Sequence, residues 1–135
     1  MALLTTKGIY GLIVLEQIAT ASQIAPIPIS DISEKTGISK GYLEQILNAL
    51  RDANFIRSIK GKNGGFYLAR RLDEINFVDV FEVLEKDFKV SNLDIKNPFI
   101  KAYIQEQNLK LRELFSRPIS DFLNFKEESV ETLNY

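Results

Sequence analysis

The sequence predicts a mainly α-helical fold of the α+β class, in which one small β-hairpin is added to a set of helices. Apolar residues recur every three or four positions in several segments, which is the spacing of amphipathic helices. Two short β-prone runs, at 55–59 and 66–68, flank the glycine-rich stretch 61–65, a pattern typical of a hairpin. A further helical segment begins after residue 97 and extends the domain as an arm.

Composition restricts the chemistry that the chain can perform. Its 135 residues favour one domain with an appendage, and 45% hydrophobic with 26% charged residues is typical of a folded, soluble protein. Cysteine and histidine are both absent, which excludes disulfides, thiol nucleophiles, imidazole bases and nearly every zinc or iron–sulfur site. Carboxylates leave a weak hard-cation site open, but we interpret them as solvated surface and expect no metal.

The sequence indicates neither a secretion signal nor a membrane span. Only Lys7 precedes the first apolar stretch, which Glu16, Gln17 and Gln23 interrupt. Every uninterrupted apolar run is shorter than a bilayer requires. We therefore expect a cytoplasmic protein with no membrane partner.

Charge is unevenly divided along the chain, although the overall net charge is only −1. Residues 1–71 hold nine Lys and Arg against five Asp and Glu, whereas residues 72–135 hold eight against thirteen. The first half is therefore basic and the second acidic. This division suits a domain that meets a polyanion, followed by a part that does not.

The first segment predicts a helix over residues 5–22, capped by Thr5 or Thr6. It is apolar around most of its circumference, so we expect it to be buried on more than one side, including against a partner subunit. Pro26 and Pro28 then require an extended connection, because prolines so close together forbid a helix.

The next two helices are short and closely spaced. The first begins at Ser30, which is a favourable N-cap, and ends at Gly37, which tolerates the left-handed conformation. Ser39 caps the second helix two residues later. Two short helices joined by a turn that contains glycine form the helix-turn-helix pattern.

The second helix of this pair has two distinct faces. One face is apolar and is expected in the core; it consists of Leu43, Ile46, Leu47 and Leu50. The other face is polar, and it consists of Gly41, Glu44, Gln45 and Asn48. Such a face is ordinarily just solvated, but glycine costs about 1 kcal/mol against alanine in a helix. A glycine here indicates that another molecule approaches closely.

The predicted hairpin is strongly basic. Residues 51–71 carry six Lys and Arg against the single acid Asp52. Glycines let a backbone approach phosphates, and lysines neutralise them. A solvated hairpin tip is the ordinary alternative, but a basic tip directly after a helix-turn-helix favours nucleic acid.

The remaining segments complete a domain and an arm. Residues 76–88 predict an amphipathic helix, capped by Asn76, whose acids Asp79, Glu82 and Glu85 face away from the core. We therefore expect a domain over 1–88, a loop over 89–97, a dimerisation helix over 98–125 kinked near Pro118, and an acidic tail over 126–135. The apolar stripe of the arm cannot be buried by one helix, so it is expected to pair with a second copy. The expected interface residues are Ile100, Tyr103, Ile104, Leu111, Leu114, Phe115 and Phe122.

Two strings, LTTKGIYGL and IPISDISEKTGISKGYLEQILNALRDANFIRSIKGKNGGFYLAR, closely resemble the Rrf-two family of bacterial regulators. The resemblance runs from about residue 4 to residue 84, and its helix-turn-helix and wing motifs are specific. It implies a winged helix-turn-helix dimer whose recognition helix enters the major groove of double-stranded DNA while the hairpin wing reaches the minor groove. Together with Asn48 and Arg57, the residues expected at DNA are Ser39, Lys40, Gly41, Tyr42, Glu44, Gln45, Lys60, Gly61, Lys62, Asn63 and Gly64.

The chain departs from the family pattern in several places. Lys60 stands where arginine is common, Gly41 where serine is frequent, and Lys62-Asn63 where Pro-Gly is usual. The cluster-binding members carry three cysteines between the domain-closing helix and the arm, and this chain has none there. We therefore expect no iron–sulfur cofactor. The remaining options are constitutive repression, a small-molecule effector or a protein effector.

The leading hypothesis is a homodimeric, sequence-specific transcriptional repressor that binds an inverted-repeat operator. The alternative is a winged-helix protein-interaction module that has lost DNA binding. Enzymatic activity is not expected, because the sequence offers neither a nucleophile–base pair nor a phosphate-binding loop.

Overall fold

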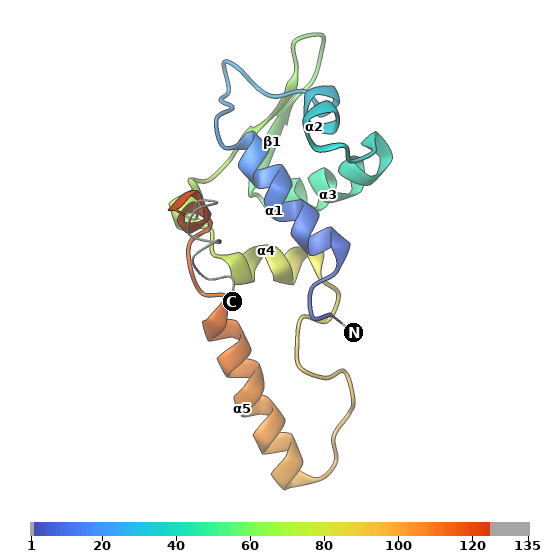
Figure 1. The fold of residues 1–135 in the computed structure, drawn as a ribbon, viewed down its shortest axis with the longest axis vertical. Helices are drawn as coiled ribbons and strands as arrows, with labels where there is room; N and C mark the ends of the chain where they lie inside the picture. The colour runs from blue at the N-terminus through green and yellow to red at the C-terminus, as the bar shows by residue number, and fades with distance from the viewer. Residues whose placement is uncertain (1, 125–135) are drawn as a thin grey trace, which may run out of the picture.

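The structure is a computed structural model that describes residues 2–124, and it places a small domain above a projecting helix (Figure 1). The elements in chain order are α1 (Thr6–Ile18), α2 (Ile29–Thr36), α3 (Lys40–Asp52), β1 (Ile56–Ile59), β2 (Gly65–Leu68), the 3₁₀ turn η1 (Leu72–Glu74), α4 (Phe77–Leu84), α5 (Pro98–Leu114) and the 3₁₀ turn η2 (Ile119–Asn124). The predicted class, mainly helical with one β-hairpin, is confirmed.

Helices α1, α2 and α3 surround the core together with α4. The predicted turn between α2 and α3 is confirmed, because Gly37 has a φ of 76° in the left-handed region. Thr36 and Ser33 tighten this turn: Thr36 Oγ1 accepts from the backbone N–H of Ile38, and Ser33 Oγ donates to the Ile38 carbonyl oxygen. These bonds satisfy both backbone groups of Ile38 in the turn and so tie the start of α3 to α2.

The two strands pair antiparallel, with Ile56 opposite Leu68 and Ile59 opposite Gly65. The extended connection after α1 adds a third element to this sheet, because Ile27 and Phe66 exchange backbone hydrogen bonds of 2.9 and 2.8 Å. This pairing fixes the base of the hairpin against the helices. The two prolines predicted the extended backbone but did not indicate its partner.

Helix α4 is shorter than the predicted helix and ends at Leu84. Its start is as expected at Asn76, whose backbone N–H donates to Oδ2 of Asp79 at 2.9 Å. The expectation that Glu85 faces away is wrong. Glu85 is only 6% exposed, and its carboxylate accepts a hydrogen bond from the backbone N–H of Thr5 at the N-terminus of α1.

The arm also differs from its prediction. Helix α5 does not continue to residue 125 with a kink at Pro118; it ends at Leu114, and the chain turns back to the domain. There the backbone of Phe77 and Val78 donates to the carbonyl oxygens of Arg117 and Phe115, each at 2.9 Å. These bonds satisfy the free N–H groups at the start of α4, which a continuous helix would leave unpaired. The tail predicted over 126–135 lies outside the described residues.

Candidate nucleic-acid interface

Helix α3 presents two faces, as its sequence pattern predicts. Leu43, Ile46, Leu47 and Leu50 are buried in the core. Gly41, Glu44, Gln45 and Asn48 lie exposed on another side of the helix. A Cβ atom added at Gly41 would meet no atom within 4 Å, so nothing in the domain requires a glycine there. The exposed face can therefore accommodate a large partner against the backbone of the helix.

The start of α3 is firmly held. Ser39 Oγ accepts from the backbone N–H of Tyr42 at 3.3 Å, which confirms the predicted N-cap. The Tyr42 ring is half-buried and makes an edge contact with Tyr10 of α1, with centroids 5.7 Å apart. Lys40 is exposed beside them. The hydroxyl hydrogen of Ser39 can still donate, because the cap bond uses only an oxygen lone pair.

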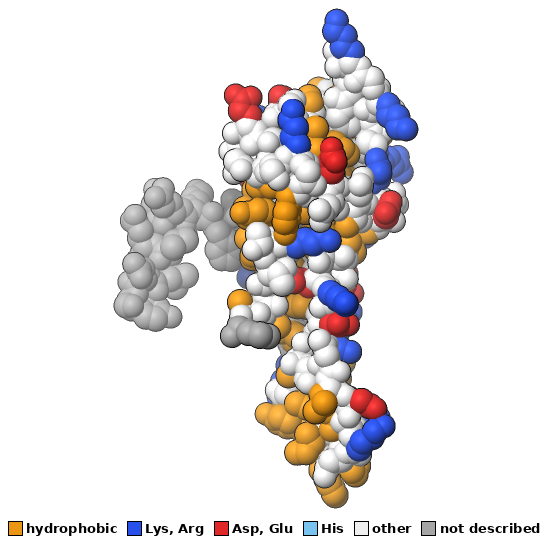
Figure 2. Space-filling view, turned by 90° about the vertical axis from the view of Figure 1, so that its right-hand side faces the viewer, with side chains coloured by type: hydrophobic (Ala, Val, Ile, Leu, Met, Phe, Trp, Pro, Cys, Tyr) orange, Lys and Arg blue, Asp and Glu red, His pale blue; other side chains and the backbone are white. Residues whose placement is uncertain are grey.

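The wing tip extends away from the core, and Lys and Arg side chains occur at the upper end of the molecule (Figure 2). Gly61 has a φ of 112°, and its carbonyl oxygen accepts from the N–H of Gly64 at 3.0 Å, which closes the turn. Lys60, Lys62 and Asn63 are exposed on this turn. Arg57 is exposed lower on β1. The tip therefore offers cations and backbone groups to a partner.

Not all basic residues of segment 51–71 are available on the surface formed by α3 and the wing. Arg70 donates to the Glu74 carbonyl oxygen at 2.8 Å and lies over the Phe55 ring at 5.7 Å from its centroid. Arg71 pairs with Asp73, and this hydrogen bond, with the nearby acids, raises the pKa of the Arg71 guanidinium. These two arginines are therefore engaged with their own chain.

Arg51 is a residue of this surface that the expected site did not include. Its guanidinium donates to Asn48 on α3 and to Ser58 on β1. It borders a hollow of about 340 Å³ whose lining residues include Pro28, Ile29, Ser58, Lys60 and Lys62. Helix α3 and the wing therefore form one continuous surface. The signal available in the sequence was the position of Arg51, three residues after Asn48 and on the same helix face.

The residues expected at the dimer interface fall into two groups. Ile100, Tyr103 and Leu114 are exposed on α5, and Ile104 and Leu111 are half-buried. Phe115 and Phe122 differ, because they pack within their own chain. Phe115 lies 5.2 Å from Phe81 between ring centroids, and Phe122 packs against the core. Phe99 and Leu109, which the expected set did not include, are also exposed on α5, at 83% and 63%.

Helix α5 has no buried residue within the chain. Hydrophobic side chains gather at the lower end of the molecule (Figure 2). Among the described residues, no helix combines the length and apolar character needed to cross a membrane.

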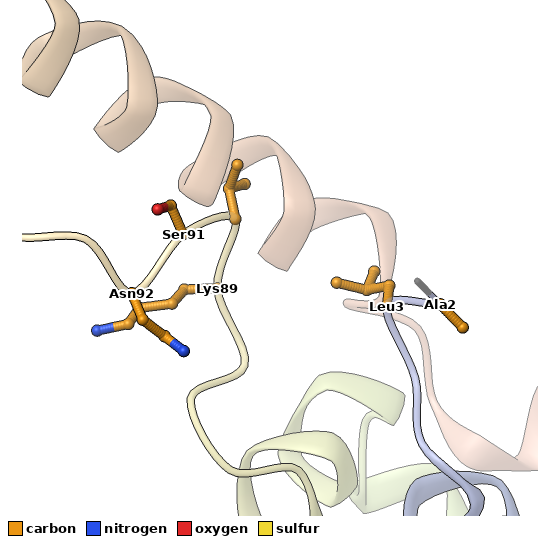
Figure 3. Close-up of a pocket in the computed structure, with 6 residues that line it drawn as sticks. Ala2, Leu3, Lys89, Ser91 and Asn92 are labelled. Atoms are coloured by element: carbon orange, nitrogen blue, oxygen red, sulfur yellow. The ribbon is translucent and has the colours of Figure 1, made fainter.

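A second hollow lies at the other end of the domain from the wing. Its volume is about 450 Å³, and it lies where the N-terminus and the loop before α5 approach that helix (Figure 3). Leu3 and Val90 supply apolar surface, and Lys89 is its charged lining residue. This arrangement offers no paired acid and base for catalysis.

A helix-turn-helix with an exposed polar face, joined to a basic wing, defines the class of winged helix-turn-helix transcriptional regulators. A family model named Rrf2 and described as an iron-dependent transcriptional regulator matches residues 4–122. The HTH-type transcriptional regulator IscR of Vibrio campbellii is 35% identical over 121 residues, covering 90% of this chain and 71% of that protein.

Two solved structures extend the comparison. CymR, the global cysteine regulator of B. subtilis, has a TM-score of 0.76 at 28% identity, covering 94% of this chain and 100% of that one. T. potens IscR has a TM-score of 0.71 at 27% identity, covering 98% and 90%. The chain belongs to the Rrf2 (Rrf-two) family of transcriptional regulators, and it is not an enzyme.

The residues of this chain do not fit a cysteine-ligated iron–sulfur cluster. The sequence has neither cysteine nor histidine. Between residues 2 and 124, no three Cys, His, Asp or Glu side chains lie together as a metal site. The loop before α5 instead carries Lys89, Ser91, Asn92 and Asp94. These side chains lack the thiolates that iron–sulfur clusters require.

Proposed function

We propose that the protein is a homodimeric, sequence-specific transcriptional repressor that binds an inverted repeat in double-stranded DNA. The observation that carries this proposal is the continuity of two surfaces. The exposed face of α3 and the basic wing are joined through Arg51, while the opposite face of α3 is buried. A helix in the major groove with a wing beside it needs this arrangement.

Within this proposal, the residues of α3 divide by chemistry. Glu44 accepts from a cytosine amino group, and Gln45 can both donate and accept at a base edge. Ser39, Lys40 and Tyr42 contact phosphates, which set the register without reading sequence. Gly41 lets the DNA approach the helix closely, since no atom stands within 4 Å of its Cβ position.

The wing residues supply mainly charge. Lys60 and Lys62 neutralise phosphates along the adjacent minor groove, and Gly61 and Gly64 keep the tip narrow. Asn63 adds polar groups at the same tip, and Arg57 extends the cationic surface down β1. Because phosphate contacts release counterions, the affinity for DNA should fall steeply as salt is added.

The arm is proposed to form the dimer. A helix of 17 residues that buries none of them in its own chain, yet exposes Ile100, Tyr103 and Leu114, needs another surface. A second copy of α5, related by a two-fold axis, is the simplest partner. Such a dimer would present its two α3 helices to half-sites about one helical turn, roughly 34 Å, apart or at a multiple of that distance. A bound dimer would then repress by covering the operator.

A cysteine-bound cluster does not serve as the sensor of this regulator, because the sequence has no cysteine to bind one. We propose that the repressor either responds to a small molecule or a partner protein, or acts constitutively.

The direct experiment is footprinting on the promoter upstream of the gene for this protein, combined with fluorescence anisotropy on the protected duplex. A variant with Lys60→Glu and Lys62→Glu should bind at least tenfold more weakly than the wild type. The matched control has Lys86→Glu and Lys89→Glu, the same charge change at exposed positions outside this surface. At 0.15 M salt the DNA affinity of the control should stay within about threefold of the wild type. At this ionic strength the interaction between exposed charges is largely screened beyond about 8 Å.

The alternative function, a protein-interaction module without DNA binding, makes the opposite prediction. In that case the wing variant and its control would have the same affinity for the promoter duplex, and no footprint would form. The exposed polar face of α3 and the two wing lysines favour the DNA-binding function.

A further inference from the structure

Arg51 lies where the polar face of α3 meets the wing. Its Nη2 donates a 2.9 Å hydrogen bond to Oδ1 of Asn48, one turn earlier on α3. Its Nη1 donates to Oγ of Ser58 on β1 at 3.3 Å. Arg51 and Asn48 are both exposed. One exposed guanidinium therefore contacts both elements that form the proposed DNA surface.

The contact also determines how the amide of Asn48 is oriented. Arginine carries only hydrogen-bond donors, so the Asn48 atom that it contacts must be the carbonyl oxygen. The amide nitrogen, with its two N–H groups, is then the end of the side chain that remains for an outside partner. Asn48 is thereby biased toward donating, although an asparagine side chain can in general do both.

We propose that Arg51 is a DNA-contacting residue that also makes Asn48 a donor toward hydrogen-bond acceptors on DNA. This inference rests on the proposed function. An unconstrained asparagine recognises adenine through both ends, accepting from N6 and donating to N7. Here Oδ1 is engaged by a cation, and that cation repels the amino group of adenine. Asn48 and Arg51 together favour a partner that only accepts.

Two groups at the major groove present such acceptors in pairs, whereas thymine presents only O4 there. Guanine presents O6 and N7 side by side in the major groove, and each phosphate presents anionic oxygens. The remaining N–H groups of Arg51 can donate to either one. The shared chemistry is therefore an oxygen or nitrogen acceptor without a neighbouring donor. A guanine would be read as sequence, whereas a phosphate would only set the register.

The bond to Ser58 extends the effect to the wing. Ser58 lies on β1, two residues before Lys60, which follows the end of that strand, and it pairs with Phe66 across the hairpin. The guanidinium thus links the strand that leads to the wing lysines to the helix that faces the groove. Loss of Arg51 should loosen this link, so the wing and α3 should contribute to binding less cooperatively.

The test compares three full-length proteins, each with its unfolding in urea measured first. The first is the wild type, and the second carries Arg51→Met, which has similar length but no donors. The third carries Arg71→Met, a matched control that loses the same charge at an exposed position paired with Asp73. Each protein selects binding sites from a random duplex library, and each is titrated with the selected wild-type site at several salt concentrations.

If the acceptor is guanine, Arg51→Met loses the guanine preference at one position in each half-site, by at least fivefold, and tolerates adenine there. If the acceptor is a phosphate, affinity falls almost equally for all sequences, and the slope of log K against log salt becomes shallower by about one per protomer. Either result supports the proposal, and the two results distinguish the sources.

A folded Arg51→Met protein that matches the Arg71→Met control in base preference and salt slope would overturn the proposal. A wild type that selects no duplex at all would instead refute the DNA-binding function from which the proposal starts.

Discussion

The carboxylate of Glu85 caps helix α1 from a position 80 residues away in the chain. Its Oε1 accepts from the backbone N–H of Thr5 at 2.7 Å, and it occupies the space that a Cβ atom of residue 8 would need, 2.1 Å away. Glu85 is the buried charged residue of the described part of the chain. The positive end of the α1 dipole stabilises its charge there. Gly8 is consequently required by the carboxylate rather than by the helix.

Replacing Glu85 should destabilise the domain, and the loss should depend on which interactions the new residue keeps. Glu85→Gln keeps an acceptor but loses the charge, and should lower the free energy of unfolding by about 1 kcal/mol. Glu85→Ala also leaves the Thr5 N–H unsatisfied, and should lower it by about 2–3 kcal/mol. Urea denaturation followed by circular dichroism measures both, with the exposed Glu74→Gln as the control. Equal stability of all three variants would contradict a capping role.

The steric relation between Gly8 and Glu85 predicts that the effect of Gly8→Ala on stability changes sign when Glu85 is removed. Gly8→Ala should destabilise the wild type, although alanine improves helix propensity by about 1 kcal/mol. In a Glu85→Ala background the same substitution should stabilise, because the obstructing carboxylate is gone. A double-mutant cycle in urea reports the coupling between the two sites. Additive effects would show that the two residues do not interact.

Gly41 predicts an effect on binding without an effect on folding. The space around its Cβ position is open, so Gly41→Trp should fold as stably as the wild type. The ring should nevertheless hinder a duplex against α3 and weaken binding at least tenfold, or about 1.4 kcal/mol. Gly41→Ala is the graded control, with affinity within about threefold and stability raised by up to about 1 kcal/mol. Fluorescence anisotropy titrations with the duplex measure both affinities. Wild-type affinity of the Gly41→Trp variant would mean that α3 does not lie against DNA.

The exposed apolar residues of α5 predict how the dimer can be broken. Ile100→Asp puts a charge into the proposed interface, whereas Gln105→Asp puts the same charge at another exposed position of the helix. The first variant should sediment as a monomer at micromolar concentration and should lose the second half-site in footprinting. The second should remain dimeric. A dimeric Ile100→Asp protein would mean that α5 is not the interface, or that residue 100 lies outside it.

The residue types predict a protein without an iron–sulfur cluster. Anaerobic purification followed by incubation with iron and sulfide should yield no charge-transfer absorbance in the visible range, since no thiolate is present to bind a cluster. DNA affinity should be the same before and after this treatment. Brown protein with stoichiometric iron and sulfide would require ligands other than cysteine.

The sequence was sufficient where the determining interactions are local. Periodic apolar residues placed α3 with its two faces, Ser39 predicted its cap, and Gly37 predicted the turn before it. The hairpin followed from two β-prone runs around glycines. In each case the interacting residues are within a few positions of each other, so their spacing carries the signal.

Tertiary structure alone decided the features that join distant segments. The sequence predicts Glu85 as a surface acid of an amphipathic helix. In the structure the N-terminus of α1 lies beside it and donates a hydrogen bond to its carboxylate. Phe115 and Phe122 continue an apolar stripe in the sequence, yet the chain after α5 folds back and packs both against its own domain. The link between Arg51 and the wing exists only because the fold brings Ser58 of β1 to the guanidinium. The physical reason is that a contact across many residues depends on how helices and strands pack together, and it leaves no periodic pattern in the residues themselves.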